Sequence, residues 1–159
     1  MIYVKSSAVT FRAMALIAAI AAALLAPPAR AQDGPQPRLR TTDLTAGMHV
    51  IRAELAVTPQ QQQTGMMFRK EMGANEGMLF VNEVAGVRCF WMRNTLIPLT
   101  IAFIDDDGTI VNLADMKPMS EQSHCSLRPV RFALEMNQGW FAKRGIKAGF
   151  RLRGAPFGG

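Results

Sequence analysis

LTIAFIDDDGTIVNL, residues 99–113, is the stretch that decides the fold. Two runs rich in β-branched and aromatic residues, Leu99–Ile104 and Thr109–Leu113, flank the turn sequence Asp105–Gly108. Such runs favour strands, and an Asp-Gly pair between them indicates a hairpin, because glycine adopts a positive φ without steric cost. We therefore expect an antiparallel β-hairpin over residues 99–113.

The segments on either side of the hairpin carry further strand patterns. Apolar and polar residues alternate over His49–Val57 and again over Val130–Met136, which indicates strands with one face against a core. Shorter strands are expected at Met78–Val81 and Arg88–Met92, and a last one at Phe150–Arg153.

Helix signals are few. Thr58-Pro59 provides an N-cap followed by proline in the first turn, so a short helix is expected over Gln60–Phe68. Gln138–Arg144 has room for two more turns before Gly145. Because no long crossover helix is indicated, we predict an α+β domain dominated by short, mostly antiparallel strands. The sheet should be small and barrel-like, with about two short helices.

The first 31 residues have the three parts of a secretory signal peptide. Met1–Arg12 carries two positive charges and no acid, and Ala13–Ala26 is a 14-residue apolar run. Ala29–Ala31 supplies the small residues needed for cleavage between Ala31 and Gln32, so export to the periplasm or the medium is predicted. A retained anchor is the alternative. However, a helix of that length rises only about 21 Å, against a hydrocarbon core of roughly 30 Å, so no stable membrane span is expected after cleavage.

One domain is expected after the signal peptide. Residues 32–43 are polar, with glycine and proline, and are predicted to be a flexible lead-in; a single β-rich domain should span 44–154, followed by a tail over 155–159. The whole chain has 18 Lys+Arg and 12 Asp+Glu, but three of the basic residues precede the cleavage site, which leaves 15 against 12. So small an excess gives no electrostatic reason to expect a nucleic-acid partner.

Two cysteines, Cys89 and Cys125, lie 36 residues apart. In an oxidising compartment they are expected to form a disulfide, which would add roughly 3–4 kcal/mol of stability in the chain-entropy model. Two buried free thiols are the alternative. The residue directly after the predicted cleavage site is Gln32 and not a cysteine, so no lipid attachment is expected there.

Motifs for several kinds of chemistry are missing from the sequence. There is no Gly-x-Ser-x-Gly, Ser-x-x-Lys, Gly-x-Gly-x-x-Gly or Walker A pattern, and the two histidines and two cysteines lack zinc spacing. No cofactor or metal is predicted. Met116, Met119 and His124 leave copper(I) binding as an alternative, because thioethers suit that ion. Methionines also fill irregular gaps in cores.

One acidic residue attracts attention. Asp105–Asp107 is predicted to be a solvated turn, whereas Glu135 sits between apolar strand positions, with Arg131 on the same face. An ion pair between Glu135 and Arg131 is the simplest expectation. The alternative is a carboxylate that contacts a ligand, or a hydrolase-type enzyme in which Glu135 acts with Arg69 and Asn94 as polarising groups.

The segment from Cys89 to Leu99 runs from aromatic strand residues into a polar turn. Trp91, Arg93 and Asn94 could line a shallow polar-aromatic pocket suited to a sugar or a peptide. The alternative is purely structural, because asparagine and threonine are good turn formers.

The order of several motifs resembles the domain of unknown function 192 family. They are Gly65–Arg69, Gly77–Phe80, Phe90–Thr95 with Pro98-Leu99, Phe103, Gly108, Leu134-Glu135, Gly139, Gly145 and Gly149. The resemblance covers roughly Leu55–Arg153 and implies a compact β-rich fold in a bacterial or archaeal protein that is often exported. It brings no established activity. Many relatives carry an acid where this chain has Thr100.

Four polar residues match polar positions of the family pattern, namely Arg69, Asn94, Thr95 and Glu135. Together with Trp91 and Arg93 they form the predicted ligand site. The leading hypothesis is an exported, non-catalytic domain of the bacterial envelope that binds a polar ligand such as carbohydrate. The Glu135 enzyme and the copper protein remain alternatives.

Overall fold

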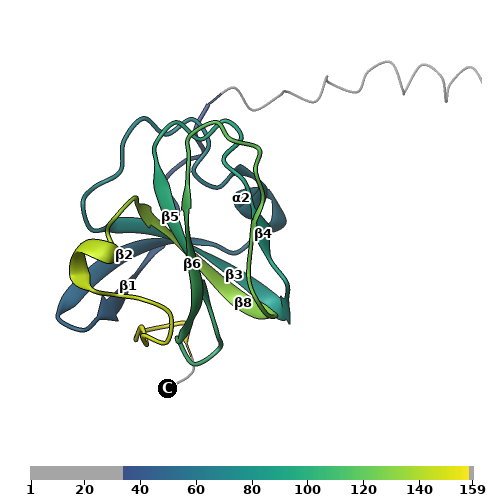
Figure 1. Cartoon of the computed structure of the whole chain (residues 1–159). Coiled ribbons are helices and arrows are strands. Elements are labelled where there is room, and N and C mark those ends of the chain that lie inside the picture. The colour runs from purple at the N-terminus through teal and green to yellow at the C-terminus, as the bar shows by residue number, and fades with distance from the viewer. Residues whose placement is uncertain (1–33, 158–159) are drawn as a thin grey trace, which may run out of the picture. The chain divides into compact units, whose positions relative to one another are not determined.

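The computed structural model describes residues 34–157, so the predicted signal peptide and its cleavage site lie outside the described residues. Figure 1 shows the succession of elements along the chain. The strands are β1 (Thr41–Ala46), β2 (His49–Ala56), β3 (Glu76–Gly86), β4 (Cys89–Phe90), β5 (Leu99–Ile104), β6 (Ile110–Met116), β7 (His124–Cys125) and β8 (Val130–Asn137). The helices are α2 (Pro59–Thr64) and the 3₁₀ helix η1 (Ala142–Arg144).

Six of the strands form one mixed sheet in the order β1-β2-β3-β8-β5-β6, and β4 pairs with β7 in a second sheet. Every neighbouring pair in the large sheet is antiparallel except β2 and β3, whose parallel connection contains α2. The hairpin predicted over residues 99–113 is confirmed as β5 and β6, with Gly108 at a φ of 88° in its turn. The prediction of a β-dominated α+β domain is therefore confirmed.

The two edges of the large sheet are joined by the end of the chain. Arg153 bridges to Thr45 of β1, and Arg151 bridges to Thr109 beside β6. No pairing between β1 and β6 themselves occurs among residues 34–157, so the sheet is barrel-like without being closed. The strand expected over Phe150–Arg153 is present only as these two isolated bridges.

Each face of the sheet has its own core. The first, here called the C-terminal face, places Ile51, Leu79 and Leu134 against Trp140 and Phe141. The second, here called the loop-covered face, lies under α2 and the segments 65–75 and 91–98. Its core includes Met78, Ile101 and Phe103 from strands, with Met66 and Met92 from the covering segments. In Figure 1 the C-terminal segment, in yellow, lies away from α2.

Several boundaries differ from the sequence prediction. β1 begins at Thr41, inside the lead-in predicted for residues 32–43; its few apolar residues give no strand signal in the sequence. β3 (Glu76–Gly86) is longer than the strand predicted over Met78–Val81, and β4 (Cys89–Phe90) is shorter than the one predicted over Arg88–Met92. The helix predicted over Gln60–Phe68 ends at Thr64, where Gly65 leaves helical geometry. Its start is as expected, with Thr58 and Gln61 forming a capping box. Of Gln138–Arg144, only the last three residues are helical.

Candidate functional site

A row of side chains on the loop-covered face contains two glutamates. Glu54 of β2 is aligned with Met78 of β3, and Met78 is aligned with Glu135 of β8. Aligned residues on neighbouring strands point to the same face, so the two carboxylates share it, with their Cα atoms roughly 10 Å apart. Both residues are 4% exposed.

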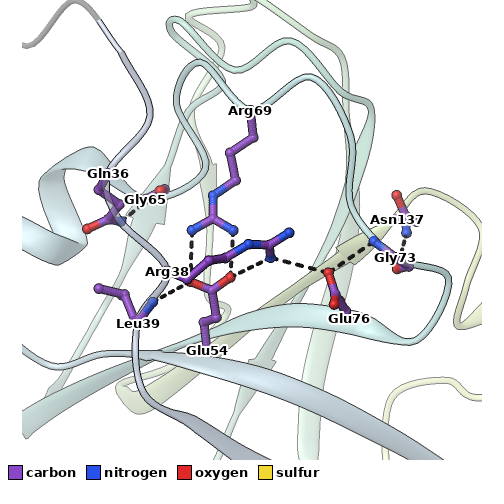
Figure 2. Close-up of polar contacts among 9 residues, drawn as sticks. All are labelled: Gln36, Arg38, Leu39, Glu54, Gly65, Arg69, Gly73, Glu76 and Asn137. Atoms are coloured by element: carbon purple, nitrogen blue, oxygen red, sulfur yellow. Dashed lines mark hydrogen bonds and ion pairs between the residues drawn. The ribbon is translucent and has the colours of Figure 1, made fainter.

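Glu54 is held by a dense set of donors (Figure 2). Arg69 Nη1 and Nη2 donate to its two carboxylate oxygens at 2.5 and 2.8 Å. Arg38 Nη1 donates at 2.8 Å, and the Leu39 backbone N–H donates at 2.8 Å. These four hydrogen bonds fill the acceptor capacity of a carboxylate.

The pair between Glu54 and Arg69 is buried as well as bidentate. The side chains of Arg69 and Glu54 are 6% and 5% exposed. Burial by itself raises the pKa of Glu54, but the hydrogen bonds from Arg69, Leu39 and Arg38 and the charge of Arg69 outweigh it and lower the pKa to about 2. Glu54 is therefore ionised at neutral pH, and the ion pair is permanent there.

The loop that carries Arg69 is fixed by its neighbours. Phe68 has a φ of 63°, and its backbone N–H donates to the Asn94 carbonyl at 2.8 Å. Asn94 and Met119 also have positive φ, and the Met119 N–H donates to the Thr95 carbonyl at 3.0 Å. Positive φ is uncommon outside glycine and costs energy, so three adjoining loops hold strained backbone beside the buried pair.

Glu135 has no such support. Among residues 34–157 no hydrogen bond or ion pair reaches its carboxyl group, which lies between Met78 and Ile101 in register. Burial raises the pKa of Glu135 to about 8, so the carboxyl group is mainly neutral at pH 7. The ion pair expected with Arg131 does not form, because Arg131 Nε donates instead to the Asn82 carbonyl at 3.0 Å.

The other predicted site residues lie in different surroundings. Trp91 is 47% exposed, and the Arg93 guanidinium lies 5.8 Å from its ring centroid. Thr95 is buried and Asn94 is half-buried. The six residues therefore divide into a buried set, which includes Arg69 and Glu135, and a surface pair, Trp91 and Arg93. Whether any of them binds a ligand stays a prediction.

An open cleft adjoins the buried ion pair. It has a volume of about 540 Å³ and lies at the β1–β2 side of the sheet. Its lining consists of Arg38, Leu39, Arg40, Thr41, Arg52, Glu54 and Glu76. Sequence reasoning missed these residues, because the alternation in β2 indicated a solvated face for Arg52 and Glu54. Composition had also indicated that residues 32–43 were flexible.

Cys89 and Cys125 form the predicted disulfide, which is therefore confirmed.

The two methionines named in the copper alternative lie in different surroundings. Met116 is fully buried whereas Met119 is 57% exposed. Residues 34–157 contain no group of three or more His, Cys, Asp or Glu side chains arranged to hold a metal. In the same residues no helix is long and apolar enough to cross a membrane.

Comparison with known proteins gives the family. The sequence profile of the DUF192 family, described as an uncharacterized ACR, matches residues 41–154. The chain belongs to the DUF192 family. The resemblance in the sequence motifs is thereby confirmed. No curated protein matches the chain.

Two solved structures of bacterial proteins resemble this DUF192 chain. One, from Sinorhizobium meliloti, is named provisionally as a transcription regulator; it is 35% identical, with a TM-score of 0.71 over 76% of this chain and 98% of its own. The other, a protein of unknown function from Novosphingobium aromaticivorans, is 38% identical. Its TM-score is 0.67, over 84% of this chain and 96% of its own.

Proposed function

We propose that this chain is an exported domain of the bacterial envelope that binds a polar ligand, such as a carbohydrate, without transforming it. The observation that carries the proposal is the cleft in front of the Glu54–Arg69 pair, which is lined almost entirely by charged and polar side chains. Its volume of about 540 Å³ falls within the range of small-ligand sites. Charged side chains at fixed positions suit the hydroxyl groups of a sugar.

Two features support export. The N-terminal 31 residues have the pattern of a signal peptide. The Cys89–Cys125 disulfide suits an oxidising compartment. Cell fractionation followed by intact-mass measurement tests this part. A secreted or periplasmic chain that begins at Gln32 is expected, and a cytosolic chain that retains Met1–Ala31 would contradict it.

A non-catalytic role is favoured over hydrolysis by the state of the two glutamates. Glu54 is saturated by four hydrogen bonds and has its pKa lowered to about 2, so it is a poor proton donor or acceptor. Glu135 is buried and does not line the cleft. The polarising partner expected for it, Arg69, is bound to Glu54 instead.

Titration of the purified protein against neutral and acidic glycans, cell-wall fragments and double-stranded DNA tests the binding function. We expect a saccharide or a cell-wall fragment to bind and DNA to give no specific signal. Thr41→Trp should abolish binding, because residue 41 is exposed and lies in the cleft lining opposite Glu54, so its enlargement fills the cleft. Thermal unfolding of this variant verifies that the Glu54–Arg69 pair still supports the fold. Val50→Trp, at an exposed position of β2 outside the cleft lining, is the matched control.

Trp91→Ala separates the two possible locations of the site. If the cleft binds the ligand, this variant keeps the affinity of the original protein. Loss of binding in Trp91→Ala with full binding in Thr41→Trp would move the site to the Trp91–Arg93 surface. No binding to any member of the panel would overturn the proposed function.

A further inference from the structure

Two arginines of the cleft have no side-chain partner among residues 34–157. Arg40, directly before β1, and Arg52, on β2, are both exposed and both line the cleft. No side-chain hydrogen bond or ion pair engages either of them within residues 34–157, whereas Arg38 and Arg69 are both committed to Glu54. The register separates them: Arg40 lies opposite Leu55, which packs on the C-terminal face, whereas Arg52 shares the loop-covered face with Glu54. Arg52 therefore supplies the free guanidinium group on the side of the buried pair.

The acids near the cleft do not neutralise Arg52. Glu54 is saturated by its four donors. Glu76 accepts from Arg38 and from the Gly73 N–H through the same oxygen, Oε2, so that no donor among residues 34–157 reaches Oε1. Arg52 is aligned with Asp43 on one side and Glu76 on the other, yet forms an ion pair with neither.

The balance of charges at the cleft favours an anionic ligand. With Arg69 behind it and Arg38 and Arg52 in its lining, the cleft gathers three arginine side chains around the carboxylates of Glu54 and Glu76. The guanidinium fork fits carboxylates and phosphates equally well. However, Glu76 and Asp43 flank Arg52, and like charges close by disfavour a ligand with two negative charges. A singly charged carboxylate suits the cleft better than a phosphate dianion.

On the basis of the proposed function, we infer that the ligand is an acidic saccharide, whose carboxylate is bound by the guanidinium fork of Arg52 and whose hydroxyl group donates to the free oxygen of Glu76, the residue aligned with Arg52. Arg52 supplies specificity for the acid, and Glu76 supplies recognition of the sugar. This combination requires a ligand that carries both groups, as a uronic acid does.

The inference is tested by calorimetric titration of the purified protein with galacturonate, which carries one carboxylate, with its methyl ester and with inorganic phosphate. We expect the acid to bind at least about tenfold more tightly than the ester, the difference that one charge-assisted hydrogen bond typically makes. Phosphate should bind more weakly than the acid. Equal affinity for acid and ester, or tighter binding of phosphate, would overturn the inference.

Three substitutions locate the recognition. Arg52→Gln should weaken binding of the acid about tenfold and leave binding of the ester unchanged, because only the acid offers a charged acceptor. Glu76→Ala should weaken binding of the ester, because it removes the oxygen that accepts from the sugar hydroxyl group. Lys117→Gln removes one positive charge next to the edge strand β6 and should leave the affinity within twofold. Thermal unfolding of each variant verifies that the fold is retained.

The failure of this inference can be told from failure of the proposed function. If the acid and the ester bind equally in the original protein and in Arg52→Gln, carboxylate recognition is wrong while polar-ligand binding stands. If Lys117→Gln weakens binding as much as Arg52→Gln does, the effect is general electrostatic attraction and the assigned contacts are wrong. If no saccharide binds in either form, both proposals are overturned.

Discussion

The two faces of the large sheet are built on different principles. On the C-terminal face, residues such as Ile51 and Leu134 pack against Trp140 and Phe141. On the loop-covered face, an apolar core of similar size also contains the ion pair of Glu54 and Arg69 and the neutral carboxyl group of Glu135, which are the ionisable side chains buried within residues 34–157. Because burial of charge seldom adds stability, the loop-covered face does something besides holding the sheet together.

The two faces also differ in how their covering residues are distributed along the sequence. The C-terminal face is covered mainly by one continuous segment, residues 140–152. The loop-covered face depends on donors from Arg38, Leu39 and Arg69, and on loops that bond one another at Phe68 and Asn94. The first face is a scaffold, and the second is an assembled site with an open cleft beside it.

The largest expected effect comes from removal of Arg69. Arg69→Leu leaves the carboxylate of Glu54 buried without its main partner, so the free energy of unfolding should fall by about 3–5 kcal/mol. Urea denaturation at pH 7 measures the loss. Introducing Glu54→Leu as well should restore most of the stability, because the uncompensated charge is gone. A loss below 1 kcal/mol in Arg69→Leu would show that the pair is not buried as described.

The second effect is a pH dependence confined to the loop-covered face. The pKa of Glu135 is raised from 4.5 to about 8 by burial, so folding favours its protonated form. The stability that this gives is full below pH 4.5 and is lost as the pH rises towards 8. At pH 8 the loss should amount to a few kcal/mol, since one pKa unit corresponds to about 1.4 kcal/mol.

Glu135→Gln tests this dependence, because glutamine cannot ionise. Urea denaturation between pH 4.5 and 8 should show a falling stability for the original protein and a flatter profile for the variant. Glu54 acts in the opposite direction: its pKa is lowered to about 2, so its contribution is present above pH 4.5 and is lost between pH 4.5 and 2. Both proteins should therefore lose stability in acid. Parallel profiles above pH 4.5 would contradict the buried position of Glu135.

The matching change on the C-terminal face should show no pH dependence. Leu134 is fully buried, and Leu134→Ala should lower the free energy of unfolding by about 3 kcal/mol through lost burial and the cavity that it leaves. Denaturation at pH 4.5 and at pH 8 should give the same difference from the original protein. A difference that changes between the two pH values by more than 1 kcal/mol would mean that the faces are not energetically separate.

The smallest effect is expected for Arg38→Ala. The side chain of Arg38 is 61% exposed, and Glu54 keeps its bonds to Arg69 and to the Leu39 N–H. The loss of stability should therefore stay below about 1 kcal/mol, as for other exposed ion pairs. Urea denaturation of Arg38→Ala beside Arg69→Leu compares the two partners of the same carboxylate. Equal losses would contradict the dominance of Arg69.

Local sequence patterns predicted the scaffold well. The hairpin over residues 99–113 follows from its β-rich runs and from Asp107-Gly108, and β8 follows from the alternation over Val130–Met136. β1 escaped notice because Thr41–Ala46 has few apolar residues. Its strand conformation depends on pairing with β2, which no local pattern records.

The site was predictable only in part. Resemblance to the family singles out Arg69 and Glu135, whereas the alternation over His49–Val57 predicts that Glu54 lies on the solvated face of its strand. Its burial depends on Arg69, 15 residues further along the chain, and on Leu39, 15 residues before it. A lone acid in a strand that also carries buried alanines on both sides, Ala53 and Ala56, was the available signal.

Backbone amide NMR during titration with galacturonate tests the central claim most directly, that the loop-covered face binds the ligand while the C-terminal face serves as scaffold. The account predicts that the largest shift changes fall on residues 38–41, on Arg52 and Glu54, and on Glu76. Amides around Leu134 and Phe141 should not move. Changes centred on Trp91 and Arg93, or on the C-terminal face, would contradict it.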